Sequence, residues 1–248
     1  MSAGHVLVTG ASGGIGSAVG ALMHSRGWTV TGTDVQPPAD DVKHLGWNVL
    51  QVDIGDAAAL EWAVGQARGV APVTAVVHAA AMQPLGPVGG LGLGVWEQTL
   101  RVNVLALEQI VQACLEDLRA HRGAVVAVSS VHAHATTPGI AAYSTSKAAL
   151  EGWVRAAALD LGPTIRVNAV APGAVRTPML VDGLARRPGS TVDQALAQLA
   201  ALTPLAVVAE PLQLAQLVAI LLDDSLTGFV TGSVFRADGG ALLKLGTE

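Results

Sequence analysis

The sequence predicts an α/β fold in which a parallel, doubly wound β-sheet is flanked by helices. Strand-like apolar runs alternate with helical runs along the 248 residues, a pattern typical of parallel strands with helical crossovers. A glycine-rich turn, residues 10–16, joins the first strand to the first helix. The composition, 51% hydrophobic and 13% charged, suits strands buried on both faces. No Pro/Ser-rich linker divides the chain, so we expect one domain over residues 1–248.

The elements follow from local periodicity and from turn residues. Strands are predicted over residues 5–9, 28–33, 48–52, 73–77, 125–130, 164–170 and 232–235. Helices are predicted over residues 17–26, 96–122, 142–161 and 211–222. Residues 179–204 form an irregular, partly helical insertion, and an insertion of this length in a compact domain indicates a lid over a binding site.

Charge and composition narrow the class of partner. The net charge of −5 comes without a cluster of basic residues, which argues against nucleic acid. Prolines and glycines interrupt the long uncharged stretches, so we expect no membrane span, and no signal segment precedes the first strand. The single cysteine, Cys114, cannot form an internal disulfide and is interpreted as a core residue. These features favour a cytoplasmic protein that binds small molecules.

The chemistry is predicted around Tyr143, the only tyrosine of the chain. Lys147 follows four residues later in a helical run, and residues i and i+4 share a helix face. An unperturbed phenol titrates near pH 10, but a neighbouring ammonium group favours the phenolate and lowers the pKa. We therefore expect Tyr143 to exchange protons near neutral pH.

Ser130 is expected to face the same site, because it lies at the carboxyl end of a predicted strand. Open α/β sheets bind ligands just outside the carboxyl ends of their strands. The hydroxyl groups of Ser130 and Tyr143 can then converge on one substrate oxygen, which predicts an acid–base site for an alcohol or a carbonyl. A tyrosine that only packs against the core is the alternative interpretation of this spacing.

The glycine-rich turn predicts a dinucleotide site. Glycines between a strand and a helix let backbone N–H groups approach a pyrophosphate. Asp34 ends the second predicted strand, eighteen residues beyond Gly16. An acidic residue at about this distance accepts hydrogen bonds from ribose hydroxyls and repels a 2′-phosphate. No Arg or Lys occupies the nearby positions Ser12, Gly13, Val35 and Gln36, so the sequence favours NAD over NADP.

Both motifs resemble those of the classical short-chain dehydrogenase/reductase family. The segment Tyr143-Ser-Thr-Ser-Lys147, with Ser130 thirteen residues before the tyrosine, is similar to the family's active-site signature. The segment Thr9-Gly10-x-x-x-Gly14-Ile15-Gly16 is similar to its cofactor fingerprint. The resemblance covers nearly all of the chain. It implies a Rossmann-type fold and hydride transfer between a nicotinamide cofactor and a secondary alcohol or its ketone.

The resemblance also implies roles for a catalytic set, Asn103, Ser130, Tyr143 and Lys147. Tyr143 is expected to be the acid or base, and Ser130 to hydrogen-bond the substrate oxygen. Lys147 is expected to lower the tyrosine pKa and to bind the nicotinamide ribose. Asn103 is expected to interrupt its helix and to hold a water that links Lys147 to solvent.

A cofactor site is implied along the carboxyl ends of the strands. Asp53 is expected to contact the adenine, and Thr177 the nicotinamide carboxamide. The family usually has Asn-Asn-Ala-Gly where this chain has His78-Ala-Ala-Ala, so His78 either replaces an asparagine contact or is a core histidine. The expected cofactor-binding residues are Gly10, Ser12, Gly13, Gly14, Ile15, Asp34, Asp53, Ala80, Tyr143, Lys147, Pro172, Gly173, Val175 and Thr177.

The expected substrate-lining residues follow strand ends or begin the lid: Met82, Gln83, His132, His134 and Met179. They combine adaptable apolar surface with hydrogen-bonding groups. We therefore expect a secondary alcohol with a second oxygen, such as a diol, a cyclic polyol or a sugar-like compound. Arg186 and Arg187 in the lid leave an anionic substrate as the less favoured alternative.

The sequence leaves three alternative functions to be weighed and predicts one state of assembly. An NADP-dependent carbonyl reductase is disfavoured by Asp34. A non-catalytic dinucleotide-binding module need not retain the four catalytic residues. A metal enzyme that uses His132-x-His134 lacks a nearby acidic or thiol ligand, so no metal is expected. The resemblance and the apolar faces of helices 96–122 and 142–161 predict a homotetramer.

Overall fold

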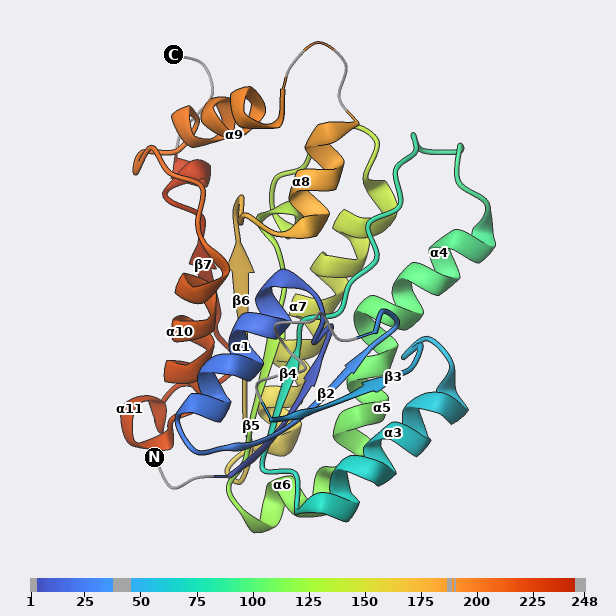
Figure 1. Cartoon of the computed structure of the whole chain (residues 1–248). Coiled ribbons are helices and arrows are strands. Elements are labelled where there is room, and N and C mark those ends of the chain that lie inside the picture. Colours follow the sequence, from blue (N-terminus) through green and yellow to red (C-terminus); the bar gives the residue numbers. More distant parts are fainter. Residues whose placement is uncertain (1–3, 38–45, 187–188, 190, 244–248) are drawn as a thin grey trace.

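The predicted fold class is confirmed by the computed structural model, which describes residues 4–37, 46–186, 189 and 191–243. Within these ranges the strands form one seven-stranded sheet, and all pairings are parallel. Its order is β3-β2-β1-β4-β5-β6-β7 (Figure 1). The strands are β1 (His5–Thr9), β2 (Thr29–Asp34), β3 (Asn48–Gln51), β4 (Ala75–His78), β5 (Ala124–Val128), β6 (Arg166–Pro172) and β7 (Val234–Ala237).

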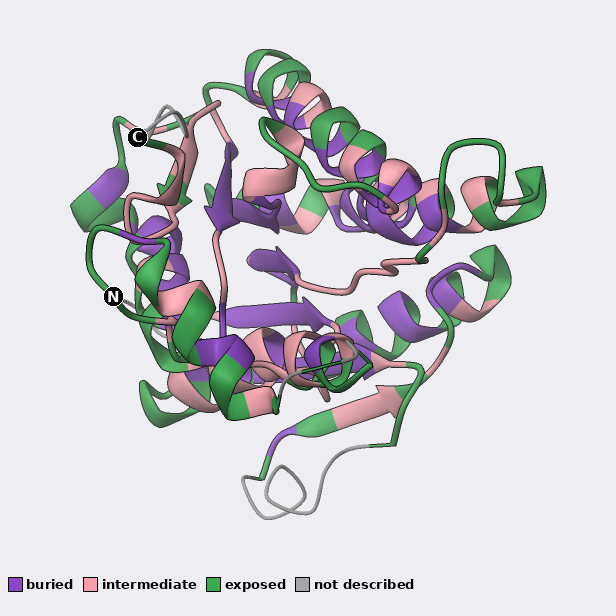
Figure 2. Ribbon diagram, turned by 90° about the horizontal axis from the view of Figure 1, so that it is seen from above, coloured by how far each residue is buried: buried purple, intermediate pink, exposed green. Residues whose placement is uncertain are grey.

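Helices cover both faces of this sheet, which lies as a buried layer between them (Figure 2). The longer helices are α1 (Gly14–Ser25), α3 (Ala57–Val70), α7 (Ala141–Leu161) and α10 (Pro211–Leu222). The shorter ones are α4 (Leu93–Leu100), α5 (Ala106–Ala113), α6 (Leu115–Ala120), α8 (Pro178–Ala185), α9 (Val192–Ala201) and α11 (Asp224–Thr227). Turns of 3₁₀ helix, η2 (Val131–Ala133) and η3 (Ala241–Leu243), complete the set with a π-helical turn, η1 (Arg101–Leu105).

The core is divided by the sheet because successive side chains of a strand point to opposite faces. In β1, Leu7 packs with α3, α5 and α7, whereas Val6 and Val8 pack with α1 and α10. All five residues of β1 are buried, as expected for a central strand of a parallel sheet.

The order of the strands reverses between β1 and β4, and this topological switch point opens a crevice at their carboxyl ends. Gly10 follows β1 and Ala80 follows β4. A Cβ added at Gly10 would lie 2.7 Å from the Ala80 nitrogen, so only a glycine lets the two segments approach this closely. Gly10 also has a φ of +68°, which glycine adopts without strain.

The helix predicted over residues 96–122 is not continuous. Four pieces replace it, and the π-helical turn η1 separates α4 from α5. Asn103 lies in this turn, so the interruption that the family resemblance implies is present. Turns of π-helix inside α-helices are rare and occur often at functional sites.

Other differences are local. The helix α3 was not predicted, although Asp56 marks its start by accepting hydrogen bonds from the Ala58 and Ala59 amides. The insertion at 179–204 contains two helices, α8 and α9, near the end of the molecule to which β6 points (Figure 1). The last two strands begin two residues later than predicted, because pairing with β5 and β6 rather than hydrophobicity sets their limits.

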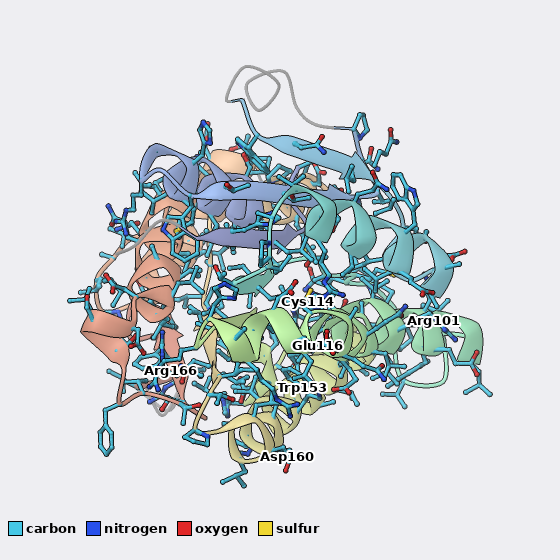
Figure 3. All side chains as sticks on the ribbon, turned by 90° about the horizontal axis from the view of Figure 1, so that it is seen from below. Arg101, Cys114, Glu116, Trp153, Asp160 and Arg166 are labelled. Carbon is cyan, nitrogen blue, oxygen red and sulfur yellow. The ribbon has the colours of Figure 1, made fainter. Side chains whose placement is uncertain are left out.

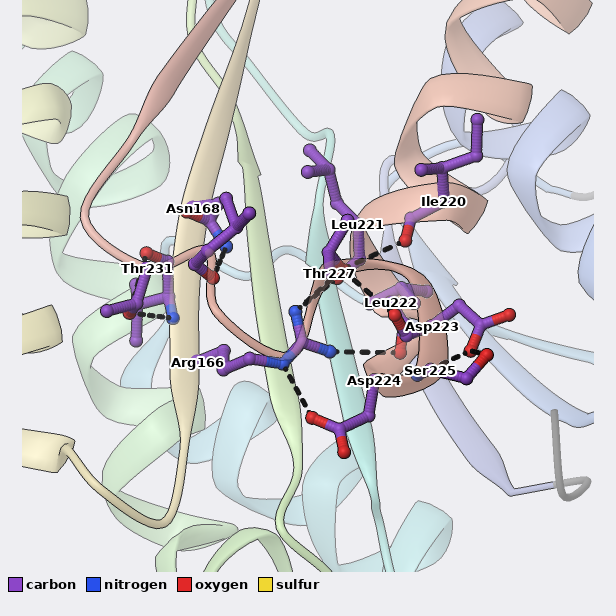
Figure 4. A network of polar contacts seen from close by, with 12 residues as sticks. Arg166, Asn168, Ile220, Leu221, Leu222, Asp223, Asp224, Ser225, Thr227 and Thr231 are labelled. Atoms are coloured by element: carbon purple, nitrogen blue, oxygen red, sulfur yellow. Dashed lines mark hydrogen bonds and ion pairs between the residues drawn. The ribbon is translucent and has the colours of Figure 1, made fainter.

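A buried arginine fastens the opposite end of the sheet. Arg166 begins β6 and is 8% exposed. Its guanidinium donates to the carbonyl groups of Leu221 and Leu222 at the end of α10, to Thr227 and to Asp224 (Figure 4). A cation at the carboxyl end of a helix pairs with carbonyls that have no partner within the helix. This network joins the carboxyl end of α10 to the first residue of β6.

Two further residues, Trp153 and Cys114, lie among the helices that cover one face of the sheet. Trp153 on α7 donates to the Glu108 carboxylate on α5 at 2.6 Å, which ties these helices together (Figure 3). Cys114 is a buried free thiol, and burial raises its pKa to about 12. None of the described helices has the length and apolar character needed to cross a membrane.

Candidate active site

Tyr143 and Lys147 share the buried face of α7, which begins at Ala141 and therefore includes both residues. Tyr143 is 8% exposed and Lys147 is 1% exposed. The Lys147 Nζ atom lies 5.6 Å from the centroid of the tyrosine ring and donates to the Val128 carbonyl at 2.7 Å. The lysine thus joins α7 to the end of β5.

Ser130 lies two residues beyond β5 in an extended conformation and is also buried. Its Oγ atom accepts a hydrogen bond from the His132 amide at 3.1 Å and begins the η2 turn. Ser130 also lies close enough to the Tyr143 side chain to lower the pKa of the phenol. The structure therefore brings the predicted serine and tyrosine together.

Burial controls the protonation of this pair. The pKa of Tyr143 is raised by burial, and the interaction with Ser130 only partly opposes that rise. Burial also lowers the pKa of Lys147 to about 7. The sequence-based expectation of a lowered tyrosine pKa is therefore wrong for this structure. Burial removes the phenolate from water, which disfavours it, and a lysine that is partly neutral near pH 7 attracts a phenolate less.

Asn103 connects three segments at the site. Its Oδ1 atom accepts from the Met82 amide at 2.8 Å, and its Nδ2 atom donates to the Met82 carbonyl at 3.0 Å. Nδ2 also donates to Ser146 on α7 at 2.8 Å. Asn103 therefore holds the segment after β4 against α7, and both of its amide hydrogens have partners within the protein.

His78 is fully buried at the end of β4. Its Nδ1 atom lies 2.9 Å from the Thr9 hydroxyl, which also accepts a hydrogen bond from the Ala80 amide. Burial, assisted by the charge of Lys147, lowers the His78 pKa to about 3. The imidazole is thus a neutral core histidine that joins β1 and β4.

The glycine turn has the shape that a dinucleotide needs. The α1 helix begins at Gly14, and its N-cap residue Gly13 offers no side-chain cap to the first amides. A Cβ at Gly14 would lie 2.7 Å from the Thr177 side chain, and one at Gly16 would collide with the Gly10 carbonyl. Uncapped amides at the positive end of a helix suit an anion, so these residues fit a pyrophosphate.

Asp34 lies beside this turn at the end of β2. Its carboxylate accepts from the Ser12 amide and the Gln36 amide, both at 2.9 Å. Asp53 is exposed two residues beyond β3, and its Oδ1 atom accepts from the Gly55 amide. The structure thus places Asp34 against the glycine turn, with Asp53 at the end of the neighbouring strand.

The segment after β6 closes the other side of the crevice. Pro172 ends β6, and Val175 is buried and bridges to Ala209. A Cβ added at Gly173 would lie 2.9 Å from the Asp238 Cα atom, so only a glycine fits here. The Thr177 Oγ1 atom accepts from the Leu180 amide and caps α8. Contact between Gly14 and Thr177 brings the two ends of the predicted cofactor site together.

The predicted substrate residues have different surroundings. The ring centroid of His132 lies 6.1 Å from that of Tyr143 in an edge-on contact, and burial lowers the His132 pKa. The Nε2 atom of His134, by contrast, lies 3.0 Å from the Glu151 carboxylate. Met82 and Gln83 are partly buried, Met179 is exposed at the start of α8, and Arg186 is exposed at its end. Arg187 lies outside the described residues.

The two histidines do not form a shared ligand set. In the part of the chain that the structure describes, no group of three or more His, Cys, Asp or Glu residues is placed to hold a metal ion.

The sequence did not predict three residues that lie at the site, namely Ser129, Ser146 and Glu151. Ser146 receives the Asn103 amide, and Ser129 donates to Glu151 at 2.7 Å. Ser146 and Glu151 lie three residues after Tyr143 and four after Lys147, so helix periodicity alone places them on the same face. That signal could have identified them, whereas their partners come from distant segments.

Comparisons with known proteins agree with this geometry. A family model described as Enoyl-(Acyl carrier protein) reductase matches residues 10–241. Protein FixR of Bradyrhizobium diazoefficiens is 33% identical over 251 residues, which cover 95% of this chain and 85% of that protein. Cyclopentanol dehydrogenase of a Comamonas species is 31% identical over 245 residues, 95% of each chain. Ligand-free aldohexose dehydrogenase of Thermoplasma acidophilum has the same fold, with a TM-score of 0.93 and 24% identity over 99% of this chain and 96% of its own.

The fold and the site define a nicotinamide-dependent oxidoreductase with a Rossmann-type sheet. The chain belongs to the classical short-chain dehydrogenase/reductase family, as the family model and the similar proteins show.

Proposed function

We propose that the protein is an NAD-dependent oxidoreductase that interconverts a secondary alcohol and its ketone. The alcohol carries a further hydroxyl or carbonyl group. The observation that carries this proposal is the convergence of Ser130, Tyr143 and Lys147 at the carboxyl end of β5. A hydroxyl donor, a phenol and a buried amine at one point are the groups that proton transfer to or from an alcohol oxygen requires.

Each residue of this set has a defined task. Tyr143 exchanges a proton with the substrate oxygen, and Ser130 holds that oxygen by a hydrogen bond. The protonated form of Lys147 stabilises the Tyr143 phenolate. Asn103 keeps the segment after β4 and the catalytic helix in register, and its η1 turn is the proposed place of the water that relays protons to solvent. The nicotinamide ring supplies or accepts the hydride.

The proposed cofactor site uses the residues already described around the crevice. Uncapped amides of α1 and the close-packed glycines receive the pyrophosphate, and Thr177 lies where the crevice closes. Asp34 accepts the hydroxyl groups of the adenosine ribose. Its carboxylate would repel a 2′-phosphate, which supports NAD as the preferred cofactor.

Replacement of Asp34 by asparagine tests this preference. We expect Asp34→Asn to narrow the ratio of kcat/KM for NAD over NADP by about tenfold or more, because a like-charge contact costs several kcal/mol. Steady-state kinetics with both cofactors measures the ratio. Glu61→Gln is a matched control that removes an exposed carboxylate from α3, outside the proposed cofactor site, and it should leave the ratio unchanged. Equal use of NAD and NADP by the wild-type protein would contradict the assignment.

The substrate class follows from the surroundings of Tyr143. His132 stands edge-on to the tyrosine ring, and its imidazole can hydrogen-bond a second substrate oxygen. The similarity to a cyclopentanol dehydrogenase supports a ring alcohol. A screen of paired ring diols and mono-alcohols, followed by NADH absorbance, tests the proposal, and preference for the mono-alcohols would contradict it.

We also propose a homotetramer. Exposed apolar residues on the helices, including Leu105 on η1 and Leu159 on α7, would be covered by two-fold symmetric packing. Light scattering would then give a mass about four times that of the 25.0 kDa chain.

A further inference from the structure

A carboxylate that the proposed mechanism does not use is buried beside the catalytic residues. Glu151 lies on α7 four residues after Lys147 and is 3% exposed. Tyr143, Lys147 and Glu151 follow one another at intervals of one helical turn, so they occupy one face of the helix. This face packs against the end of β5 and the η2 turn.

The two carboxylate oxygens of Glu151 contact one residue that precedes Ser130 in the sequence and one that follows it. Oε1 accepts a hydrogen bond from the Ser129 hydroxyl at 2.7 Å, and Oε2 lies 3.0 Å from the His134 Nε2 atom. Ser129 immediately precedes Ser130, and its amide donates to the Val170 carbonyl of β6. The backbone from Ser130 to His134 is closed by two short-range bonds, from the Ala133 amide to the Ser130 carbonyl and from the His134 amide to the Val131 carbonyl.

These contacts connect the Glu151 carboxylate, through His134 and the η2 turn, to the hydroxyl group of Ser130. A buried carboxylate is costly unless it is hydrogen-bonded, so its partners and the carboxylate hold one another in place. His134 holds the far end of the η2 turn, and the His132 amide within that turn donates to the Ser130 Oγ atom. A shift of His134 would therefore move the hydroxyl that faces Tyr143.

We propose that Glu151 is a positioning residue for Ser130. Its carboxylate clamps Ser129 and His134 onto α7, so that the Ser130 hydroxyl keeps its place relative to Tyr143. Glu151 itself does not touch the substrate. This inference rests on the proposed function, in which Ser130 holds the substrate oxygen.

Kinetics of Glu151 variants tests the clamp in the full-length protein. We expect Glu151→Ala to lower kcat by about tenfold or more, since a displacement of about 1 Å can cost up to about 10²-fold in rate. The Kd for NADH should stay within about twofold of the wild-type value, because the glycine turn does not contact α7 through this network. Glu151→Gln keeps an oxygen for Ser129 and should recover most of the lost kcat.

The matched control is Asp160→Ala, which removes an exposed acidic side chain from the same helix at the edge of the molecule (Figure 3). It should leave kcat and the Kd for NADH unchanged. If Glu151→Ala does not fold, Ser129→Ala and His134→Ala each remove one half of the clamp and should each lower kcat. A Glu151→Ala protein that folds and matches Asp160→Ala in kcat overturns the proposal, as does a Glu151→Gln protein as slow as the alanine variant.

Hydrogen exchange separates this proposal from the proposed function. In Glu151→Ala, backbone amides of residues 129–135 should exchange about tenfold faster or more, whereas those of α1 should not change. Exchange in 129–135 that is equal to wild type excludes the clamp even if the enzyme is active. Faster exchange in a protein that turns over no alcohol or ketone would support the clamp and refute the proposed function.

Discussion

Replacement of Tyr143 by phenylalanine should lower kcat by about 10²–10⁴-fold, the usual contribution of a general acid–base group. The ring would still fill its buried place on α7 and keep its edge-on contact with His132, so only the exchangeable proton is lost. NADH binding, measured by fluorescence titration, should stay close to that of the wild-type protein. Stopped-flow and steady-state assays of alcohol oxidation measure the loss of turnover.

A matched control for this variant is Ser144→Ala, next to Tyr143 on α7. Ser144 is partly buried and donates to the Ala141 carbonyl, within its own helix. It should leave kcat near the wild-type value. Retention of most of the kcat by Tyr143→Phe would mean that the tyrosine has a structural role and that the proposed mechanism is incorrect.

Replacement of Lys147 by methionine should abolish most turnover and, at low pH, stabilise the fold. Removal of one group that stabilises developing negative charge typically costs about 10²–10³-fold in kcat. Burial lowers the Lys147 pKa to about 7, so below that pH the native protein holds a buried ammonium group at a cost. Methionine fills a similar volume without a charge.

The sign of the pH dependence follows from the two pKa values. The pKa of the Lys147 ammonium group is near 10.4 in the unfolded chain and about 7 in the folded protein. Between these two pH values the unfolded state binds more protons, so the stability of the wild-type protein rises with pH. At about pH 6 the variant should gain about 1–3 kcal/mol in the free energy of unfolding, after the loss of the hydrogen bond to Val128. This gain should disappear as the pH approaches about 10.

Urea unfolding of both proteins across this pH range measures the effect. A Lys147→Met protein that is less stable than wild type at every pH would show that the hydrogen bond to Val128 outweighs the cost of the buried charge. A constant difference would show that folding does not lower the Lys147 pKa.

The sequence by itself determined the fold class and the position of the site along the chain. Strand and helix periods are local, so alternating runs predict the parallel sheet, and the carboxyl ends of its strands place Gly10, Asp34 and Ser130 along one edge. The interval between Tyr143 and Lys147 placed them on one helical face for the same reason. These inferences needed only the geometry of single elements.

Tertiary structure decided which groups meet and how they titrate. The partner of His78 is Thr9, 69 residues away, and Asn103 pairs with Met82 and Ser146 rather than with solvent. The pairing of His134 with Glu151 depends on how the η2 turn packs on α7. No periodicity reports such contacts, because they join residues that are far apart in the sequence. The pKa of Tyr143 rises for the same reason: burial is produced by the whole fold, and it outweighs the opposing influence of Ser130.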